Sequence, residues 1–379
     1  MAPIHFSIPS QAPNEMAYVS EVLRTRNLSG DGPFTKRCHN WLSQHHNSAT
    51  ALLTTSGTAA LELSCILAGL EAGDEVIMPS YTFPSTANAV VLRGAVPVFV
   101  DVEPATLNIN PALLEQALTT RTRAIMPIHY AGVVSEMDPI LDFAVKHDLI
   151  VIEDAAQSLG STYKGTPAGL LGDCAAVSFH KTKNIVSGEG GAFITKRADF
   201  SERAEIVREK GTNRVHFLAG LVDKYTWIDV GSSFLPSELQ AAVLLAQLEE
   251  FEKTTERHLE IWALYNSGLA ELQSQGHITR LVPPNHGTHN GHLFALILDE
   301  RHERAEVLGA LHNRNVQAVF HYVPLHSSPA GTKFGRCAHP MPVTDRAGTQ
   351  LIRLPLYAGL TDNQVAFVIE ALTAALTGS

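Results

Sequence analysis

The chain has 379 residues, of which 45% are hydrophobic and 17% charged, and its formal net charge is −10. This length and composition predict a globular protein with a sizeable core and two lobes. The negative charge argues against a general nucleic-acid binder, which needs clustered Lys and Arg. Because no apolar run could span a bilayer and the N-terminus lacks a secretion signal, we expect a soluble, cytoplasmic protein.

Cysteine and histidine usage gives no sign of a disulfide framework or a metal site. Cys38, Cys65, Cys174 and Cys337 are widely spaced and predict reduced thiols. The densest histidines are His45, His46, His286, His289 and His292. His289 and His292 have no acid or cysteine nearby at ligand spacing, so we interpret them as surface or substrate-side residues and expect no metal.

Up to about residue 200, apolar strand-like runs alternate with helical patterns. This alternation predicts an α/β fold with a mainly parallel sheet and helices on both faces. The runs are Leu52–Thr55, Glu75–Met78, Val96–Val100, Arg123–Met126 and Leu149–Ile152.

The remaining chain predicts a long helical connection and a smaller lobe. Helical spacing covers residues 236–252 and then about 255–272, which places a large domain at 1–250 and a small α+β domain at 251–379. In the small domain we expect strands at 292–298 and 316–320 and a last helix at about 362–376.

The most informative stretch is residues 178–191, which read SFHKTKNIVSGEGG and place a lysine between a strand end and a glycine-rich turn. A lysine in a pocket that lowers its pKa becomes a nucleophile for carbonyl groups, and pyridoxal phosphate, held as a Schiff base, is a frequent partner. Lys183 is the candidate. Considered alone, Lys181 and Lys183 could equally be solvated loop charges.

Two further segments follow strands. Asp154 comes just after the run at 149–152, at the sheet edge where α/β proteins bind ligands. Its carboxylate could meet the protonated pyridine nitrogen of the cofactor, and Gln157 could reach the ring hydroxyl. Residues 56–58 follow the first strand and open a helix, where free amides favour a phosphate. By themselves, Asp154 and Ser56 could simply cap helices. The combination favours a cofactor site.

These three segments resemble the sugar aminotransferases of the DegT/DnrJ/StrS type, which have the aspartate aminotransferase-like fold, PLP fold type I. The resemblance covers nearly the whole chain. It implies that Lys183 forms the Schiff base, that Asp154 and Gln157 contact the ring, and that Phe83 stacks on it, although Phe83 could otherwise be core packing. It assigns the phosphate contacts to Gly57, Thr58 and Ser178.

Four more stretches strengthen the resemblance: 30–35 (GDGPFT), 76–83 (VIMPSYTF), 209–214 with 223–227 (EKGTNR, DKYTW), and 320–326 with 329–331 (FHYVPLH, PAG). Within the family they imply transfer of an amino group from L-glutamate to C4 of dTDP-4-keto-6-deoxy-D-glucose. The product, dTDP-4-amino-4,6-dideoxy-D-galactose (dTDP-fucosamine), feeds surface polysaccharides such as enterobacterial common antigen. His321, Tyr322 and His326 would line the substrate side, or else pack at a strand end.

One position departs from the wider family. Many members carry an asparagine that reaches the phosphate from the neighbouring subunit, and here the matching residue is Ser233. A serine hydroxyl can still donate a hydrogen bond. The resemblance also implies a homodimer with active sites at the subunit interface.

Three other functions are compatible with part of this sequence. Amination at C3, or at C4 with opposite stereochemistry, would use the same cofactor site. A nicotinamide Rossmann oxidoreductase would share the strand and helix alternation, but its Gly-x-Gly-x-x-Gly motif after the first strand is absent. A non-catalytic protein on this fold would be expected to have lost Lys183 or Asp154.

Overall fold

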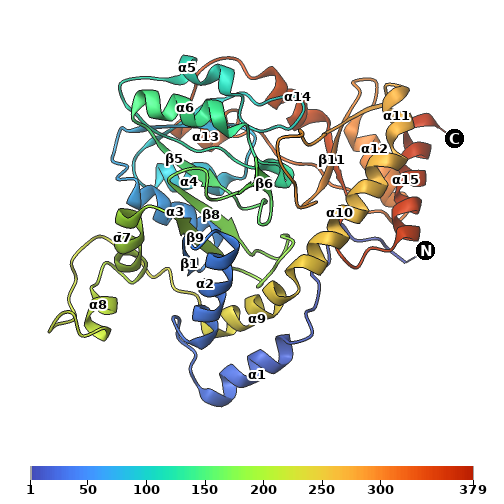
Figure 1. Cartoon of the computed structure of the whole chain (residues 1–379). Helices are drawn as coiled ribbons and strands as arrows, with labels where there is room; N and C mark the ends of the chain where they lie inside the picture. The colour runs from blue at the N-terminus through green and yellow to red at the C-terminus, as the bar shows by residue number, and fades with distance from the viewer. Residues whose placement is uncertain (1, 379) are drawn as a thin grey trace.

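An eight-stranded sheet forms the centre of the larger lobe in the computed structural model, which describes residues 2–378 (Figure 1). Its order is β1-β9-β8-β5-β4-β2-β3-β12, and β9 alone runs antiparallel to its neighbours. The strands are β1 (Thr50–Thr54), β2 (Glu75–Pro79), β3 (Val96–Val100), β4 (Thr122–Ile125), β5 (Ile150–Asp154), β8 (Cys174–Ser178), β9 (Gly191–Thr195) and β12 (Arg336–Cys337). A hairpin of β6 (Thr162–Tyr163) and β7 (Thr166–Pro167) stands apart.

Alternate residues of each strand face two different helical layers, as the two-residue period of a strand requires. On one face, Leu52 and Met78 pack with the helices that follow β1, β2 and β9. On the other, Leu53 packs with the two helices before β1 and with the helix at 238–249, and Ile77 packs with the helices at 114–117 and 137–147. Because both faces are covered, the strands are apolar along nearly their whole length.

The helices around this sheet come from most of the chain. They are α1 (Glu15–Thr25), α2 (Pro33–His45), α3 (Gly57–Leu67), α4 (Pro84–Val91), α5 (Leu114–Ala117), α6 (Met137–His147), α7 (Ala198–Arg208), α8 (Arg214–Leu218), α9 (Glu238–Glu249) and α13 (Pro329–Phe334), with short 3₁₀ turns η1 (Pro111–Leu113) and η2 (Tyr130–Gly132).

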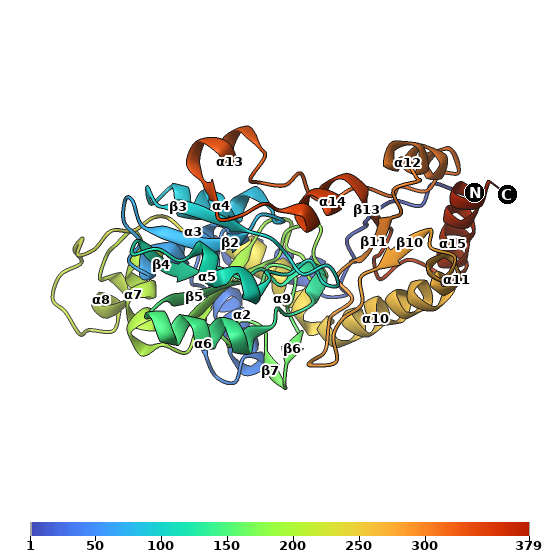
Figure 2. The same cartoon turned by 90° about the horizontal axis from the view of Figure 1, so that it is seen from above.

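The smaller lobe lies at the opposite end of the elongated molecule from α8, beside both chain termini (Figure 2). Its antiparallel sheet has the order β10-β11-β13. Its elements are α10 (Phe251–Gly268), α11 (Ala270–Ser274), β10 (Ile278–Arg280), β11 (Phe294–Leu298), α12 (Arg304–Asn313), α14 (Pro342–Gln350), β13 (Leu351–Leu354) and α15 (Asp362–Thr377). The large mainly parallel sheet and the small antiparallel one confirm the predicted fold class.

We propose the domain boundary near residue 250 because a separate apolar core begins with α10 and includes α12 and α15. Two segments cross between the lobes. Ile4, near the N-terminus, is fully buried in the small core, and β12 returns to pair with β3 of the large sheet.

The prediction of a strand at 316–320 is wrong. This segment makes only two isolated bridges, Val316 with Ile4 and Val319 with Arg353. Its apolar pattern resembles a strand, but a strand needs a continuous hydrogen-bonded neighbour, and here the partners on each side come from different parts of the chain.

The first residues of the chain form an N-terminal strap, defined here as residues 4–12, that crosses the small lobe. The Ile4 amide donates to the Asn315 carbonyl at 2.8 Å, and the Gln317 amide donates to the Ile4 carbonyl at 3.0 Å. The Leu356 amide donates to the Phe6 carbonyl at 3.4 Å. The strap therefore lies beside the segment that follows β13.

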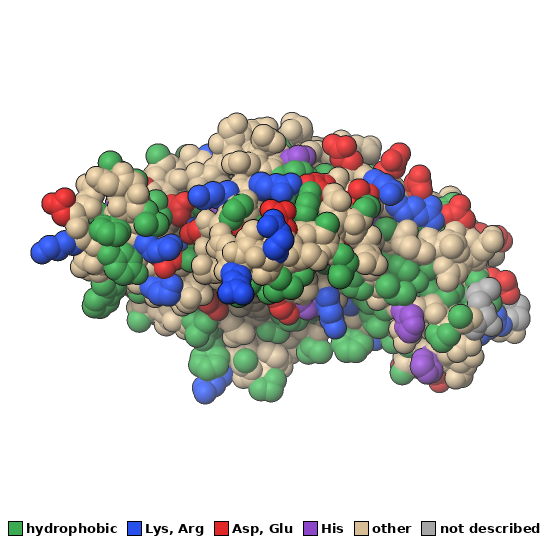
Figure 3. Space-filling model, turned by 90° about the horizontal axis from the view of Figure 1, so that it is seen from below, with side chains coloured by type: hydrophobic (Ala, Val, Ile, Leu, Met, Phe, Trp, Pro, Cys, Tyr) green, Lys and Arg blue, Asp and Glu red, His purple; other side chains and the backbone are tan. Residues whose placement is uncertain are grey.

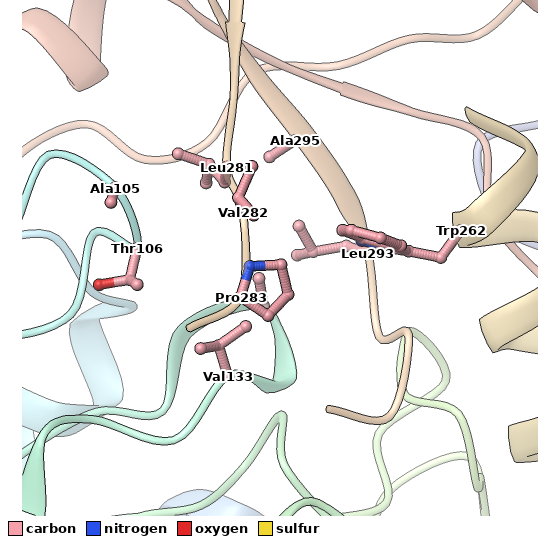
Figure 4. A pocket seen from close by; sticks show the side chains of 10 residues that line it. Ala105, Thr106, Val133, Trp262, Leu281, Val282, Pro283, Leu293 and Ala295 are labelled. Atoms are coloured by element: carbon pink, nitrogen blue, oxygen red, sulfur yellow. The ribbon is translucent and has the colours of Figure 1, made fainter. Parts of the chain in front are cut away.

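The two lobes meet at an apolar junction (Figure 4). Thr106 and Val133 of the large lobe face Trp262, Leu281 and Leu293 of the small lobe across a narrow cavity. A buried cluster that includes Tyr81, Tyr130 and Ala295 continues this junction toward the strand ends. The two lobes therefore share this buried cluster.

Some features concern the whole described chain. Within residues 2–378, no helix is long and apolar enough to cross a membrane, and no group of three or more His, Cys, Asp or Glu side chains could hold a metal ion. Cys38, Cys65 and Cys174 are buried and Cys337 is exposed, and all four are free.

Candidate functional site

The site forms where β1, β5 and β8 end, because parallel strands bring their carboxyl ends to one edge of the sheet. Gly57 begins α3 directly against Ser178 at the end of β8: a Cβ on Gly57 would lie 2.8 Å from the Ser178 Cβ. Gly191 approaches from β9, where a Cβ would lie 2.4 Å from the Ser56 carbonyl carbon. Glycine is required at both positions for these segments to touch.

The N-terminus of α3 is shaped to receive an anion. Ser56 caps the helix by accepting a hydrogen bond from the Ala59 amide at 3.0 Å. The Thr58 and Ser85 hydroxyls lie 2.7 Å apart, so one donates to the other and the second keeps its O–H free to donate at this edge. Free amides, hydroxyls and the helix dipole together favour a phosphate. The structure thus brings Gly57, Thr58 and Ser178 together as the sequence predicts.

Asp154 ends β5 and is buried, with 6% of its surface exposed. Its Oδ2 accepts from the Thr86 hydroxyl at 2.8 Å and its Oδ1 from the Ala156 amide at 3.2 Å. Burial raises the pKa of Asp154, against the hydrogen bonds and the positive charge of Lys183. A buried carboxylate in this state is suited to pair with a positively charged ring nitrogen.

Lys183 lies in a loop whose base is closed by backbone hydrogen bonds. Phe179 donates to the Gly190 carbonyl, Ser187 donates to the Phe179 carbonyl, and Lys183 donates to the His180 carbonyl, all at 2.8 Å. Gly188 has a φ of 83°, which requires glycine for the return of the loop. The loop fixes the lysine backbone while its side chain stays free to react.

The electrostatic environment activates Lys183. Burial lowers its pKa from 10.5 to about 8; the carboxylate of Asp154 opposes this shift and the positive charge of Arg353 adds to it. A larger share of the amine is then neutral, and so nucleophilic, near neutral pH.

Hydrogen bonds of Asn184 and Asn290 connect the Lys183 loop to the small lobe. The Asn184 Nδ2 donates to the Asn290 carbonyl at 2.9 Å, and the Asn184 Oδ1 lies 2.8 Å from the His292 Nδ1. The buried Asn290 Nδ2 in turn donates to the Gln157 carbonyl at 2.9 Å. His292 is therefore half-buried beside the Lys183 loop.

Gln157 and the aromatic side chains line the same edge. The Gln157 Oε1 accepts from the Ala131 amide at 2.8 Å, and its Nε2 donates to the Tyr322 hydroxyl at 3.1 Å. Phe83 is 59% exposed, and its ring centre lies 6.3 Å from that of Tyr322. An exposed ring at this edge is available to stack on a ligand, which favours stacking over core packing for Phe83.

The three residues predicted to line the substrate side differ in their contacts. His321 Nδ1 lies 3.1 Å from the Tyr130 hydroxyl, and Tyr322 lies beside Gln157. His326 is held at both nitrogens: Ser80 Oγ lies 2.7 Å from its Nδ1 and Asp345 lies 3.2 Å from its Nε2. His326 therefore anchors its segment to the end of β2 in this structure, whereas His321 contacts Tyr130 and Tyr322 contacts Gln157.

Ser233 lies away from Lys183 along the chain but close to β1. It is exposed and bridges Glu209, and the next residue, Phe234, accepts from the Thr55 amide at 2.9 Å. The intersubunit phosphate contact of Ser233 remains a proposal.

Three functional features are absent from the sequence prediction. Thr86 follows the stretch at 76–83, and only its position beside Asp154 shows its role. The buried pair of His129 and Glu153, 2.8 Å apart, supports the strand that carries Asp154. Arg353 is a lone charge in the apolar run 351–356, and such a charge is a sequence signal for a functional residue.

This donor set fits pyridoxal phosphate. The cradle formed by Gly57, Thr58 and Ser178 would hold its phosphate, Asp154 would hold its ring nitrogen, and Lys183 would bond to its carbonyl carbon. The fit rests on the close approach of two glycines, a buried acid and an activated lysine at one sheet edge.

Comparisons with known proteins identify the family of this chain. A model of the DegT/DnrJ/EryC1/StrS aminotransferase family matches residues 9–373. GDP-perosamine synthase of Caulobacter vibrioides is 34% identical over 376 residues, covering 97% of each chain. The spore coat polysaccharide biosynthesis protein SpsC of Bacillus subtilis is 34% identical over 382 residues, covering 99% of this chain and 97% of its own.

A solved structure gives the same fold. The PMP form of Spr1654 from Streptococcus pneumoniae, described as a sugar aminotransferase, superposes with a TM-score of 0.90 at 27% identity, covering 99% of this chain and 98% of its own. A nicotinamide oxidoreductase is thereby excluded. The chain belongs to the DegT/DnrJ/EryC1/StrS aminotransferase family and is a pyridoxal phosphate-dependent aminotransferase of nucleotide sugars.

Proposed function

We propose that the protein transfers the amino group of L-glutamate to C4 of dTDP-4-keto-6-deoxy-D-glucose and forms dTDP-4-amino-4,6-dideoxy-D-galactose. The observation that supports this proposal is that the sequence stretches resembling such enzymes, far apart in the chain, are hydrogen-bonded to the large sheet or to one another. The product would serve surface polysaccharide synthesis, for instance that of enterobacterial common antigen.

Hydrogen bonds connect these stretches to the sheet. The stretch at 30–35 contributes Asp31, which accepts from the Arg208 Nη2 at 2.7 Å, while the Arg208 Nη1 donates to the Leu53 carbonyl at 3.2 Å. The stretches at 76–83 and 320–326 meet through Tyr81, whose hydroxyl donates to the His321 carbonyl. The stretch at 209–214 follows Arg208 directly.

The residues of the chain supply binding and proton transfer. When bound, pyridoxal phosphate supplies an electron sink for the substrate carbon that loses its proton. With a pKa near 8, the Lys183 amine can take up that proton and return it near neutral pH. The Asp154 carboxylate, held by Thr86, maintains the negative charge that a protonated ring nitrogen needs.

A homodimer is part of this proposal. The segment 214–230, here called the α8 arm, exposes apolar side chains at one end of the molecule (Figure 3). Leu218, Leu221 and Trp227 are 66%, 73% and 77% exposed. Large apolar side chains gathered on a surface favour a protein contact, and a second copy of the chain is the partner that the family resemblance implies.

The dimer is tested by mass. Light scattering after gel filtration should give about twice the chain mass of 41.0 kDa. Leu221→Glu with Trp227→Glu should shift the protein toward monomer, whereas Val145→Glu, at a side chain that is 85% exposed on α6, should not. A monomeric wild-type protein would exclude this assembly.

The reaction is tested with purified protein, pyridoxal phosphate, L-glutamate and the keto sugar. Mass spectrometry should detect an amino sugar nucleotide together with 2-oxoglutarate. Lys183→Ala should abolish product while the melting curve stays close to that of the wild type; an unchanged rate would contradict the role of Lys183. Lys181→Ala is the matched control, because Lys181 is an exposed lysine of the same loop.

The second candidate differs in the substrate rather than the chemistry. The similarity to a GDP-perosamine synthase favours testing a GDP-linked keto sugar beside the dTDP-linked one. Amination at C3, or at C4 with opposite stereochemistry, would use the same Lys183 and Asp154. The ratio of the kcat/KM values for the dTDP-linked and the GDP-linked keto sugar decides between the two substrates. We expect the dTDP-linked sugar to have the higher value.

A further inference from the structure

Arg353 carries a half-buried positive charge that has no counter-ion among the described residues. It lies in β13 between the buried residues Ile352 and Leu354. Its Nε is buried and has no hydrogen-bond partner, and its Nη2 lies 3.4 Å from the Phe320 carbonyl, near the limit of a hydrogen bond. Among the described residues, no carboxylate forms an ion pair with it.

The surroundings of Arg353 are poor in negative charge. Burial lowers its pKa, and the groups that oppose this shift are the phenols of Tyr130, Tyr322 and Tyr81. In turn, its positive charge contributes to lowering the pKa of Lys183, His292 and His321, after the larger effect of burial in each case. Removing a cation even partly from water without pairing it with an anion is costly, so a ligand that brings an anion to this place is stabilised.

The N-terminal strap holds this guanidinium from one side. The Arg353 Cζ lies 4.5 Å from the centre of the Phe6 ring, a distance at which a cation and an aromatic face attract. The main chain fixes both partners, since Leu356 bonds to the Phe6 carbonyl and Arg353 exchanges two backbone hydrogen bonds with Val319. Phe6 thus orients the charge without neutralising it.

We propose that Arg353 binds a carboxylate of the amino donor and that Phe6, through the N-terminal strap, is a positioning residue for it. This inference rests on the proposed donor reaction. The strap, although it is distant in sequence from the cofactor residues, then forms part of the donor site.

The position of the charge favours a carboxylate over the diphosphate of the nucleotide sugar. In an α-amino acid, the carboxylate is attached to the carbon that bears the amine, so its receptor must lie near Lys183. In the keto sugar, C4 lies across the hexose ring from the diphosphate, whose receptor must lie further out. Arg353 is bonded through its backbone to Val319 and through its Nη2 to the Phe320 carbonyl, directly before His321, and its charge acts on Lys183.

The test follows each substrate separately with cofactor-loaded protein. Absorbance records conversion of the cofactor by L-glutamate without sugar, and conversion back by the keto sugar. Arg353→Gln should raise the glutamate KM by about tenfold to a hundredfold, the loss expected for hydrogen bonds to a charged group. The KM of the keto sugar should change by less than about threefold. Arg353→Lys should be intermediate because it keeps the charge but loses the planar fork.

Phe6→Leu isolates the strap. It should raise the glutamate KM in the same direction by about threefold, as for loss of a cation–π contact, and leave kcat nearly unchanged. Arg314→Gln, at an exposed arginine of the same lobe 3.9 Å from Glu370, is the control and should alter neither constant. Melting curves confirm that each variant is folded.

A binding measurement separates this inference from the donor proposal. Titration calorimetry with glutarate should give a dissociation constant that both variants raise. Arg353→Gln should raise it more than Phe6→Leu does, as with the glutamate KM. If the wild type used another amino acid instead of glutamate, the proposed donor would be wrong, while glutarate would still test Arg353. An unchanged glutarate constant in Arg353→Gln, or a raised KM for the keto sugar alone, would overturn the inference.

Discussion

The lowered pKa of Lys183 gives a quantitative prediction for the protein without cofactor. With a pKa of about 8 in place of 10.5, about a quarter of the amine is neutral at pH 7.5, against roughly one part in a thousand for an ordinary lysine. Lys183 should therefore react with an amine reagent about two hundred times faster than its usual pKa would allow, after correction for access.

Competitive labelling with isotopic acetic anhydride measures this directly. The peptide that contains Lys183 is quantified by mass spectrometry from pH 6 to 10, with a free lysine peptide as reference. Labelling of Lys183 should rise with pH and level off above pH 8, since only the neutral amine reacts. Labelling that keeps rising toward pH 10 would refute the assignment.

Two variants should move this midpoint in opposite directions. The carboxylate of Asp154 favours the charged amine, so Asp154→Asn should shift the midpoint to lower pH. The guanidinium of Arg353 disfavours it, so Arg353→Gln should shift the midpoint to higher pH. If neither variant shifted the midpoint, burial alone would control the pKa of Lys183, and shifts of the same sign would contradict the opposite effects assigned to these two charges.

Further predictions concern the cofactor, stability and substrate segment. Gly191→Ala should weaken pyridoxal phosphate binding in a fluorescence titration, because its Cβ would lie 2.4 Å from Ser56; Gly309→Ala, with open space around it, should not. Burial raises the pKa of Glu75, but hydrogen bonds from Arg336, Thr119 and Arg121 outweigh it and hold the value at about 2. Its stabilisation should thus be complete above about pH 4.5 and fade toward pH 2, and in urea unfolding Glu75→Gln should cost about 2 to 3 kcal/mol at neutral pH and little at pH 2. His326→Ala should raise the KM of the keto sugar more than that of glutamate, since it frees the segment anchored to Ser80; equal KM changes would argue against that role.

Many elements of both lobes could be predicted because the information that specifies them is local. The run Val96–Val100 coincides with β3, and the helix predicted at about 362–376 corresponds to α15. Both are continuous apolar patterns whose period matches the element. The false strand at 316–320 has the right composition but lacks a continuous partner, because Ile4 and Arg353 supply only isolated bridges.

The residues of the candidate site also fall into those that a local motif predicts and those that depend on distant contacts. Lys183, Asp154 and Gly57 stand in short motifs at strand ends, so their chemistry can be inferred from neighbours in sequence. The contact of Asn184 with His292 and the pair of Arg353 with Phe6 join residues more than a hundred positions apart. Such contacts depend on how the lobes pack, which no local pattern contains.

The configuration of the product tests the central claim most directly. The protein is incubated with pyridoxal phosphate, L-glutamate and dTDP-4-keto-6-deoxy-D-glucose, and proton NMR couplings of the isolated sugar give the geometry at C4. We expect an axial amine at C4, which is the galacto configuration. An equatorial C4 amine, a C3 amine or no transfer would contradict the proposed reaction.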